Sequence, residues 1–179
     1  MSSDLIGILR TGARPLAVAL ALFATTQASA QFSNKSLGLA LGYMKMNADP
    51  SVDWAVPLSL EGSLYIESGF DLVIRVAPML VTNKISGLQL FGCSFNLGVR
   101  YLFSEESLRP YVGIGLAGLY LDRVDQQAGY AGVGAFAGLD YFVADSISIG
   151  ARAFANIYLM LNTPMTEGFG AQGVVATYF

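Results

Sequence analysis

The run from Phe91 to Phe103 alternates strictly between two kinds of side chain, and no other run in the sequence does so for as long. Its apolar positions are Phe91, Cys93, Phe95, Leu97, Val99, Tyr101 and Phe103, and the positions between them are Gly92, Ser94, Asn96, Gly98, Arg100 and Leu102. A period of two is that of a β-strand, whose successive side chains point to opposite faces. The segment is therefore predicted to be a strand with one continuous apolar face and one face that is mainly small or polar.

Composition limits the classes of protein to which such a strand could belong. The chain has 179 residues, enough for one domain, and 54% of them are hydrophobic while only 13% are charged. A soluble domain usually carries about 25% charged residues. Beyond the N-terminus no run of about 18 apolar residues occurs, which excludes a bundle of transmembrane helices. These features leave a membrane β-barrel or an unusually apolar soluble β-protein.

The first thirty residues have the features of a secretory signal. Arg10 and Arg14 precede an apolar run from Leu16 to Ala24, and Ala28-Ser29-Ala30 supplies small residues for cleavage before Gln31. The apolar run is too short to span a bilayer. Residues 1–30 are predicted to be a signal peptide and residues 31–179 the barrel domain, with a retained N-terminal helix as the alternative.

Eight segments of the mature chain show strand alternation. They are Ser36–Met46, Pro57–Glu67, Phe70–Thr82, Gly87–Phe103, Arg109–Leu121, Tyr130–Val143, Ile147–Leu161 and Gly168–Phe179. Three connections are tight (67–69, 104–107 and 144–146), three are longer (47–56, 122–129 and 162–167), and only the link at 83–86 breaks this order. An even number of strands with tight turns at one end and longer loops at the other is typical of outer-membrane barrels. The predicted fold is all-β, an eight-stranded antiparallel up-and-down transmembrane β-barrel.

The faces of these strands indicate which side meets lipid. A soluble barrel such as a lipocalin has the same period with an apolar interior, but its exterior needs a dense coat of charged residues. Here the non-apolar face consists mainly of Gly, Ala, Ser and Tyr. Eight strands leave an interior just wide enough for side chains. The Leu, Ile, Val and Phe side chains are therefore predicted to face lipid and the small and polar ones the lumen.

Three segments resemble the OmpA/OmpX-like superfamily of small outer-membrane barrels. They are Arg109–Gly115 (RPYVGIG), Gly132–Tyr141 (GVGAFAGLDY) and the closing Val174–Phe179 (VVATYF). The resemblance covers residues 31–179 and implies a bacterial outer-membrane location, contact with outer-membrane lipid and recognition by the barrel-assembly machinery. Phe179 looks like the terminal assembly signal of such proteins, although Thr177 stands where a larger apolar residue is more usual. No peptidoglycan-binding domain is expected to follow.

Five charged residues are predicted to face the lumen and pair with one another: Glu61, Arg75, Arg100, Asp140 and Arg152. A three-residue loop at 67–69, with Gly69 left-handed, pairs Ile66 with Phe70 and places Glu61 opposite Arg75.

The same reasoning at the turn near residue 145 puts Asp140 level with Arg152 or one diagonal step from it. Arg100 is expected at a depth similar to that of Arg75. Such ion pairs would close the lumen and fix the strand register.

The sequence offers little for catalysis or cofactor binding. The chain contains no histidine, whereas barrel enzymes of this size, such as lipid A deacylases and palmitoyltransferases, resemble serine hydrolases in needing one as a base. Glu61 and Asp140 could do acid–base work, but the inward arginines favour ion pairs. No His or Cys cluster indicates a metal site. Cys93 is interpreted as a small hydrophobic residue of the apolar face. The Gly113–Gly118 match to G-x-G-x-x-G lies mid-strand, where a dinucleotide site would need a helix.

Two functions remain open from sequence alone. The first is a non-enzymatic barrel with a structural or surface-interaction role and a lumen plugged by ion pairs; the alternative is an OmpW-like conduit or binder for apolar small molecules. Residues 47–56 and 122–129 are candidate contacts for a surface partner, and no nucleic-acid partner is expected. Trp54, in the first of these loops, would either anchor a partner or belong to the aromatic belt at the membrane surface.

Overall fold

Eight long strands make up nearly all of the described chain. The computed structural model describes residues 34–47, 52–83, 87, 89–122, 127–159 and 166–179, and the predicted signal at residues 1–30 lies outside them. The strands are β1 (Lys35–Met46), β2 (Val52–Glu67), β3 (Phe70–Asn83), β4 (Gln89–Leu102), β5 (Leu108–Asp122), β6 (Gln127–Ala144), β7 (Ile147–Leu159) and β8 (Thr166–Tyr178). Among the described residues no helix is long and apolar enough to cross a membrane.

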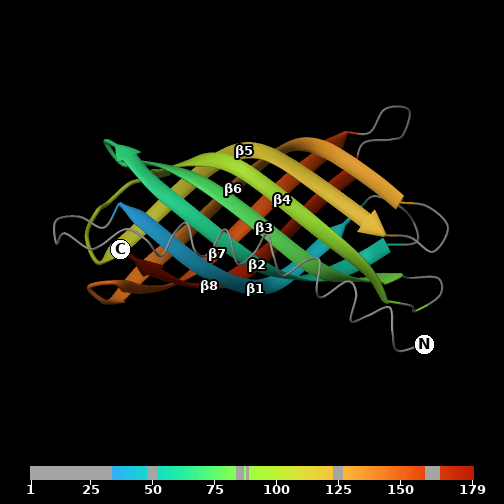
Figure 1. Cartoon of the computed structure of the whole chain (residues 1–179), viewed down its shortest axis with the longest axis horizontal. Coiled ribbons are helices and arrows are strands. Elements are labelled where there is room, and N and C mark those ends of the chain that lie inside the picture. Colours follow the sequence, from blue (N-terminus) through green and yellow to red (C-terminus); the bar gives the residue numbers. More distant parts are fainter. Residues whose placement is uncertain (1–33, 48–51, 84–86, 88, 123–126, 160–165) are drawn as a thin grey trace. The chain divides into compact units, whose positions relative to one another are not determined.

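The strands close into a single barrel (Figure 1). Each strand pairs antiparallel with the next one in the sequence, and β1 pairs with β8 to complete the circle. Along this seam, residues 36–46 of β1 pair without a break with residues 178–168 of β8. The amide of Phe179 donates a further hydrogen bond of 3.0 Å to the carbonyl of Lys35. The predicted up-and-down barrel is confirmed, and its sheet has no free edge.

Side chains of alternate residues face the outer wall and the lumen, as the period predicted. On the outer wall Ile114 is 71% exposed and Leu97 38% exposed, whereas inward Arg100 is 3% exposed. We call the end of the barrel with the connections at 68–69, 103–107 and 145–146 the turn end, and the opposite end the loop end. In outer-membrane barrels the short turns are periplasmic and the longer loops extracellular.

Aromatic residues gather on the outer wall near both ends. At the turn end the ring of Tyr101 lies 5.0 Å from that of Phe70 and 5.2 Å from that of Phe103. At the loop end Trp54 stacks on Tyr43 with ring centroids 6.3 Å apart. Trp54 therefore lies on a strand, at a position that suits the aromatic girdle of a membrane barrel.

Two predicted loops are shorter than the sequence suggested. The loop assigned to 47–56 is wrong because β2 already begins at Val52, and the loop assigned to 122–129 is wrong because β6 begins at Gln127. Likewise β8 begins at Thr166, inside the connection predicted at 162–167. Backbone pairing continues here, as Asp122 with Gln127 shows. Because the ladder satisfies backbone groups whatever the side chains are, polar side chains do not end the strand.

The hairpin between β2 and β3 has a different turn from the predicted three-residue loop. Ser68 and Gly69 have φ values of 53° and 84°, and positive φ at both central residues is the requirement of a type I′ turn. Glu67 pairs with Phe70, and the register shifts between Tyr65 and Glu67. This bulge adds one residue to β2, so the ladder beyond it has the same register that the three-residue loop would give.

Glycines in β5 and β6 relieve crowding inside the narrow barrel. A Cβ at Gly113 would collide with the ring of Phe136, and one at Gly132 would collide with the carbonyl oxygen of Ile157. The small residues of the strands were predicted to face the lumen, but Gly118 lies on the outer wall, because it is an odd number of residues from the inward Gly113 and Gly115.

Candidate functional site

The lumen of the barrel contains two layers of different chemistry, and the order of residues along β3 shows how they stack. From the turn end, the inward side chains of β3 are Asp71, Val73 and Arg75, and beyond Ala77 come Met79 and Val81. The charged residues belong to a set that we call the ionic layer: Glu61, Asp71, Arg75, Arg100, Asp140 and Arg152. The apolar ones belong to the apolar cap: Met44, Met46, Ala55, Met79, Val81, Ala117, Leu119, Leu121 and Tyr158.

Glu61 is the centre of the ionic layer. It lies directly opposite Arg75 across the β2–β3 pair, and its Oε2 accepts a hydrogen bond of 2.9 Å from Arg75 Nε. The same oxygen accepts a hydrogen bond from Nη1 of Arg152, which belongs to β7. Arg100 Nη1 lies 3.7 Å from Glu61 Oε1. One carboxylate thus ties together three guanidinium groups from three different strands.

Arg100 joins this centre to the other two carboxylates. Its Nε and Nη2 both lie 2.7 Å from Oδ2 of Asp71, the residue opposite it on β3. Its Nη1 lies 3.6 Å from Oδ2 of Asp140 on β6. The six groups therefore form one connected network with three positive and three negative charges, and each residue is only 2–5% exposed.

Neutral polar groups extend the network toward β8. Arg152 Nη2 donates a hydrogen bond of 2.7 Å to Gln172 Oε1, and Gln172 Nε2 donates one of 2.7 Å to Ser59 Oγ. Hydrogen bonds to the remaining donors and acceptors are what make buried charges tolerable.

Two aromatic rings, Tyr111 of β5 and Phe136 of β6, support the guanidinium groups. The Arg75 guanidinium carbon lies 5.1 Å from the centre of the Phe136 ring, and that of Arg100 lies 5.0 Å from the centre of the Tyr111 ring. Both distances are within the range of a cation–π contact. The two rings also pack edge-on, with centroids 6.3 Å apart.

The sequence-based pairing of the lumen charges was right in part. Glu61 and Arg75 face each other as expected, and Arg152 is one diagonal step from Asp140, whose register partner is Gly150. However, Arg152 pairs with Glu61 instead, and the ion pair of Asp140 is with Arg100.

The prediction that Arg100 lies at a depth similar to that of Arg75 is wrong. The residue opposite Arg75 is Asn96, and Arg100 lies four residues farther along β4, opposite Asp71, toward the turn end. Asp71 was left out of the predicted set although its parity places it on the face of Arg75. The strand alternation was a sufficient signal for including it.

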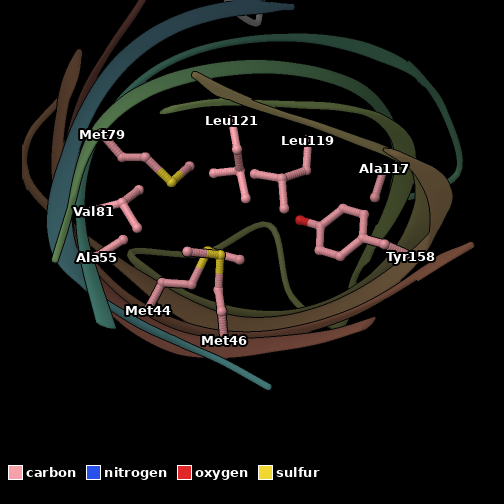
Figure 2. Packing of buried hydrophobic residues seen from close by; sticks show 9 residues of the cluster. All are labelled: Met44, Met46, Ala55, Met79, Val81, Ala117, Leu119, Leu121 and Tyr158. Atoms are coloured by element: carbon pink, nitrogen blue, oxygen red, sulfur yellow. The ribbon is translucent and has the colours of Figure 1, made fainter. Parts of the chain in front are cut away.

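The apolar cap was not anticipated from the sequence. Figure 2 shows its side chains converging on the interior of the barrel, with the thioethers of Met44 and Met46 beside each other in this view and that of Met79 pointing into the same space. Met44 and Met46 are 1% exposed and Met79 is 2% exposed. The lumen is thus apolar toward the loop end and ionic toward the turn end.

A pocket of about 260 Å³ opens at the turn end. Arg109 lines it, with its guanidinium carbon 4.1 Å from the centre of the Phe142 ring and its nitrogens donating to the carbonyls of Glu105 and Glu106. On the other side Tyr65 donates a hydrogen bond of 2.7 Å to Glu105. These contacts fix the connection between β4 and β5 against the mouth of the barrel.

Other predicted sites are less defined by the structure. Of the loops proposed to meet a partner, residues 48–51 and 123–126 lie outside the described residues. Phe179 is half-buried beside the β1–β8 seam. Within the described ranges, no group of three His, Cys, Asp or Glu side chains is arranged to hold a metal ion.

Comparison with known proteins relates this architecture to one family. The model of the outer membrane protein beta-barrel domain matches residues 15–160. No match to a curated protein was found.

Three solved structures illustrate the shared fold. Neisserial surface protein A is 17% identical with a TM-score of 0.62, and the match covers 82% of this chain and 98% of that one. OprG of Pseudomonas aeruginosa is 11% identical with a TM-score of 0.56, covering 82% and 95%. The outer membrane enzyme PagL is 17% identical with a TM-score of 0.54, covering 80% and 99%. At such low identity the likeness is one of fold.

Proposed function

Because this chain belongs to the outer membrane protein beta-barrel domain family and thus to the bacterial outer membrane, we propose that it is a non-enzymatic barrel with a structural or surface-interaction role and a closed lumen. The observation that carries the proposal is the ionic layer. Its three carboxylates and three guanidinium groups are balanced in charge, connected and almost fully buried.

Closure follows from the energetics of such a layer. Separating a buried ion pair, so that one partner is left without the other, costs about 3–5 kcal/mol. A hydrated ion crossing the lumen would have to break several of these contacts at once, and would then meet the apolar cap. The network therefore acts as a plug, and it also ties β2, β3, β4, β6 and β7 together.

Catalysis is not part of the proposal. Histidine is absent from the sequence, so a nucleophile activated by a histidine base cannot be assembled from this chain. The fold itself does not decide the question, because PagL has a similar fold and is an enzyme. The buried carboxylates of the ionic layer are engaged with arginines, which supports a structural role for them.

A conduit or binder for apolar small molecules is the second candidate function. The apolar cap favours it, because methionine side chains adapt their shape to different neighbours and three of the nine residues in the cap are methionines. For passage through the barrel, however, the ionic layer beneath the cap would also have to open.

Planar-bilayer recordings distinguish the two functions. We expect the wild-type barrel to be nearly silent, and Glu61→Ala to produce small, flickering conductance or to destabilise the barrel. Glu67→Ala is the matched control, since Glu67 is an exposed residue at the β2–β3 turn. A large, steady wild-type conductance would contradict the plug and support the conduit.

The proposed partners are outer-membrane lipid along the outer wall, the barrel-assembly machinery during biogenesis, and a surface partner at residues 47–56 and 122–129. Phe179 is the proposed assembly signal. In cells, Phe179→Ala should lower the fraction of the chain that is found in the membrane as a heat-modifiable barrel. If the same variant still folds in detergent, the loss in cells reflects recognition by the assembly machinery and not the stability of the barrel.

A further inference from the structure

Methionine is concentrated in one place in the described barrel. All three methionines of the described residues, Met44, Met46 and Met79, belong to the apolar cap, and each is at most 2% exposed. They come from β1 and β3, two strands separated in the sheet by β2. In the view of Figure 2 all three side chains point into the lumen, with the thioethers of Met44 and Met46 next to each other and that of Met79 apart from them.

Small neighbours make room for these long side chains. Met44 and Met46 lie opposite Gly170 and Gly168 across the β1–β8 seam, and Met79 lies opposite Gly92 of β4. A Cβ at Gly168 would collide with the methyl group of Met44, and one at Gly92 would come within 3.0 Å of Met79 Cγ. The thioethers therefore occupy space that glycines leave inside the barrel.

The chemistry of the cap suits one class of ligand. Thioether sulfur is a soft, neutral donor that selects Cu(I) and related ions over the hard cations that prefer oxygen. A bare cation in an apolar interior is costly unless it is coordinated, and a singly charged ion with three sulfur donors meets that condition. The absence of His and Cys clusters from the sequence does not bear on thioether ligands.

We propose that Met44, Met46 and Met79 form a binding site for a soft monovalent cation, Cu(I) or Ag(I), at the loop end of the lumen. The long and unbranched methionine side chains can adjust their rotamers to close around the ion. Binding does not require the lumen to open, because the ionic layer lies farther toward the turn end. The site is thus independent of whether the barrel is a plug or a conduit.

Silver binding tests the site with a redox-inert probe. The full chain, folded in detergent in a chloride-free buffer, is titrated with Ag⁺ by calorimetry. Cys93→Ala, Met160→Leu and Met165→Leu form the common background, since Cys93 lies on the outer wall and the two methionines lie outside the described residues. We expect one Ag⁺ per barrel, with Zn²⁺ unable to compete.

Variants of the three methionines decide the assignment. Each single Met→Leu change should weaken Ag⁺ binding by about tenfold or more, which corresponds to about 1.4 kcal/mol, and the triple change should abolish it. Leu is close to Met in volume and keeps the cap packed. Leu90→Ile, at a residue that packs against the cap but is not one of its nine members, should bind as the background does.

Two results would overturn the proposal. One is a triple Met→Leu variant that remains a heat-modifiable barrel and binds Ag⁺ as tightly as the background. The other is a folded background protein that shows no saturable Ag⁺ binding. X-ray absorption of the barrel loaded with Cu(I) under ascorbate gives a second readout: a sulfur shell around copper supports the site, and a shell of only nitrogen and oxygen contradicts it.

Discussion

Glu61→Gln is the change that most directly tests whether the ionic layer holds the barrel together. It removes one negative charge at nearly constant volume from the residue that contacts Arg75, Arg100 and Arg152. Arg100 keeps Asp71 at 2.7 Å, and Arg152 keeps Gln172 at 2.7 Å. In the described part of the chain neither Arg75 nor Arg152 keeps another carboxylate, and Arg75 Nη2 and Arg152 Nε already lack a hydrogen-bond partner.

The magnitude follows from the stranded charges on Arg75 and Arg152. Removing one partner of a buried ion pair costs about 3–5 kcal/mol, so Glu61→Gln should lower the free energy of unfolding by that amount. Asp140→Asn is the matched control. Its ion pair with Arg100 is longer, at 3.6 Å, and Arg100 keeps Asp71, so the expected loss is only about 1–3 kcal/mol.

Reversible urea unfolding from lipid vesicles, followed by the fluorescence of Trp54, measures both changes. Trp54 is the only tryptophan in the sequence. The double variant Glu61→Gln/Arg75→Gln should recover part of the stability, because it removes the charge that Glu61→Gln strands. The reasoning would be refuted if Glu61→Gln lowered the free energy of unfolding no more than Asp140→Asn does. It would also be refuted if the double variant lost more free energy of unfolding than Glu61→Gln and Arg75→Gln lose when added together.

Other predictions concern the outer wall, the crowded interior and the hairpin. Leu97→Arg or Ile114→Arg should cost about 2–4 kcal/mol in the same unfolding assay, and a neutral result would mean that the faces are reversed. Gly113→Ala should also destabilise the barrel, since its methyl group would collide with the Phe136 ring and with the carbonyl oxygen of Val99; Phe136→Leu in the same chain should restore only part of the stability, because it relieves the first collision and not the second. Gly69→Ala should slow refolding or lower stability because Gly69 has a φ of 84°, which disfavours a residue with a Cβ.

Strand identity and facing could be predicted from the sequence because both depend on local alternation. In β4 the period of two assigned every described inward residue, including Arg100, before any contact was known. Strand ends were harder to place. Near the loop end the outer side chains become polar, as at Asp122, although the backbone pairing continues from Asp122 to Gln127. Residues that belong to a strand therefore have the polar composition that is typical of a loop.

Partner choice inside the lumen could not be read from register alone. Register relates neighbouring strands, whereas Arg152 on β7 reaches Glu61 on β2 across the barrel. Long guanidinium side chains make such contacts possible between strands that never pair. The apolar cap was missed for a different reason: the inward face was treated as uniformly small or polar, although the alternation in β1 and β3 places Met44 and Met79 inward as well.

The β1–β8 seam joins the two parts of the sheet that are farthest apart in the chain, and this has a consequence for how the barrel folds. Every other strand pair joins neighbours in sequence, whereas Ser36 meets Tyr178. Pairings of such long sequence separation raise contact order and slow folding. Until the seam forms, β1 and β8 are both open edges that could pair with another chain. We therefore expect closure of the seam to limit the folding rate, and substitutions there to slow folding more than equally destabilising changes between β2 and β3.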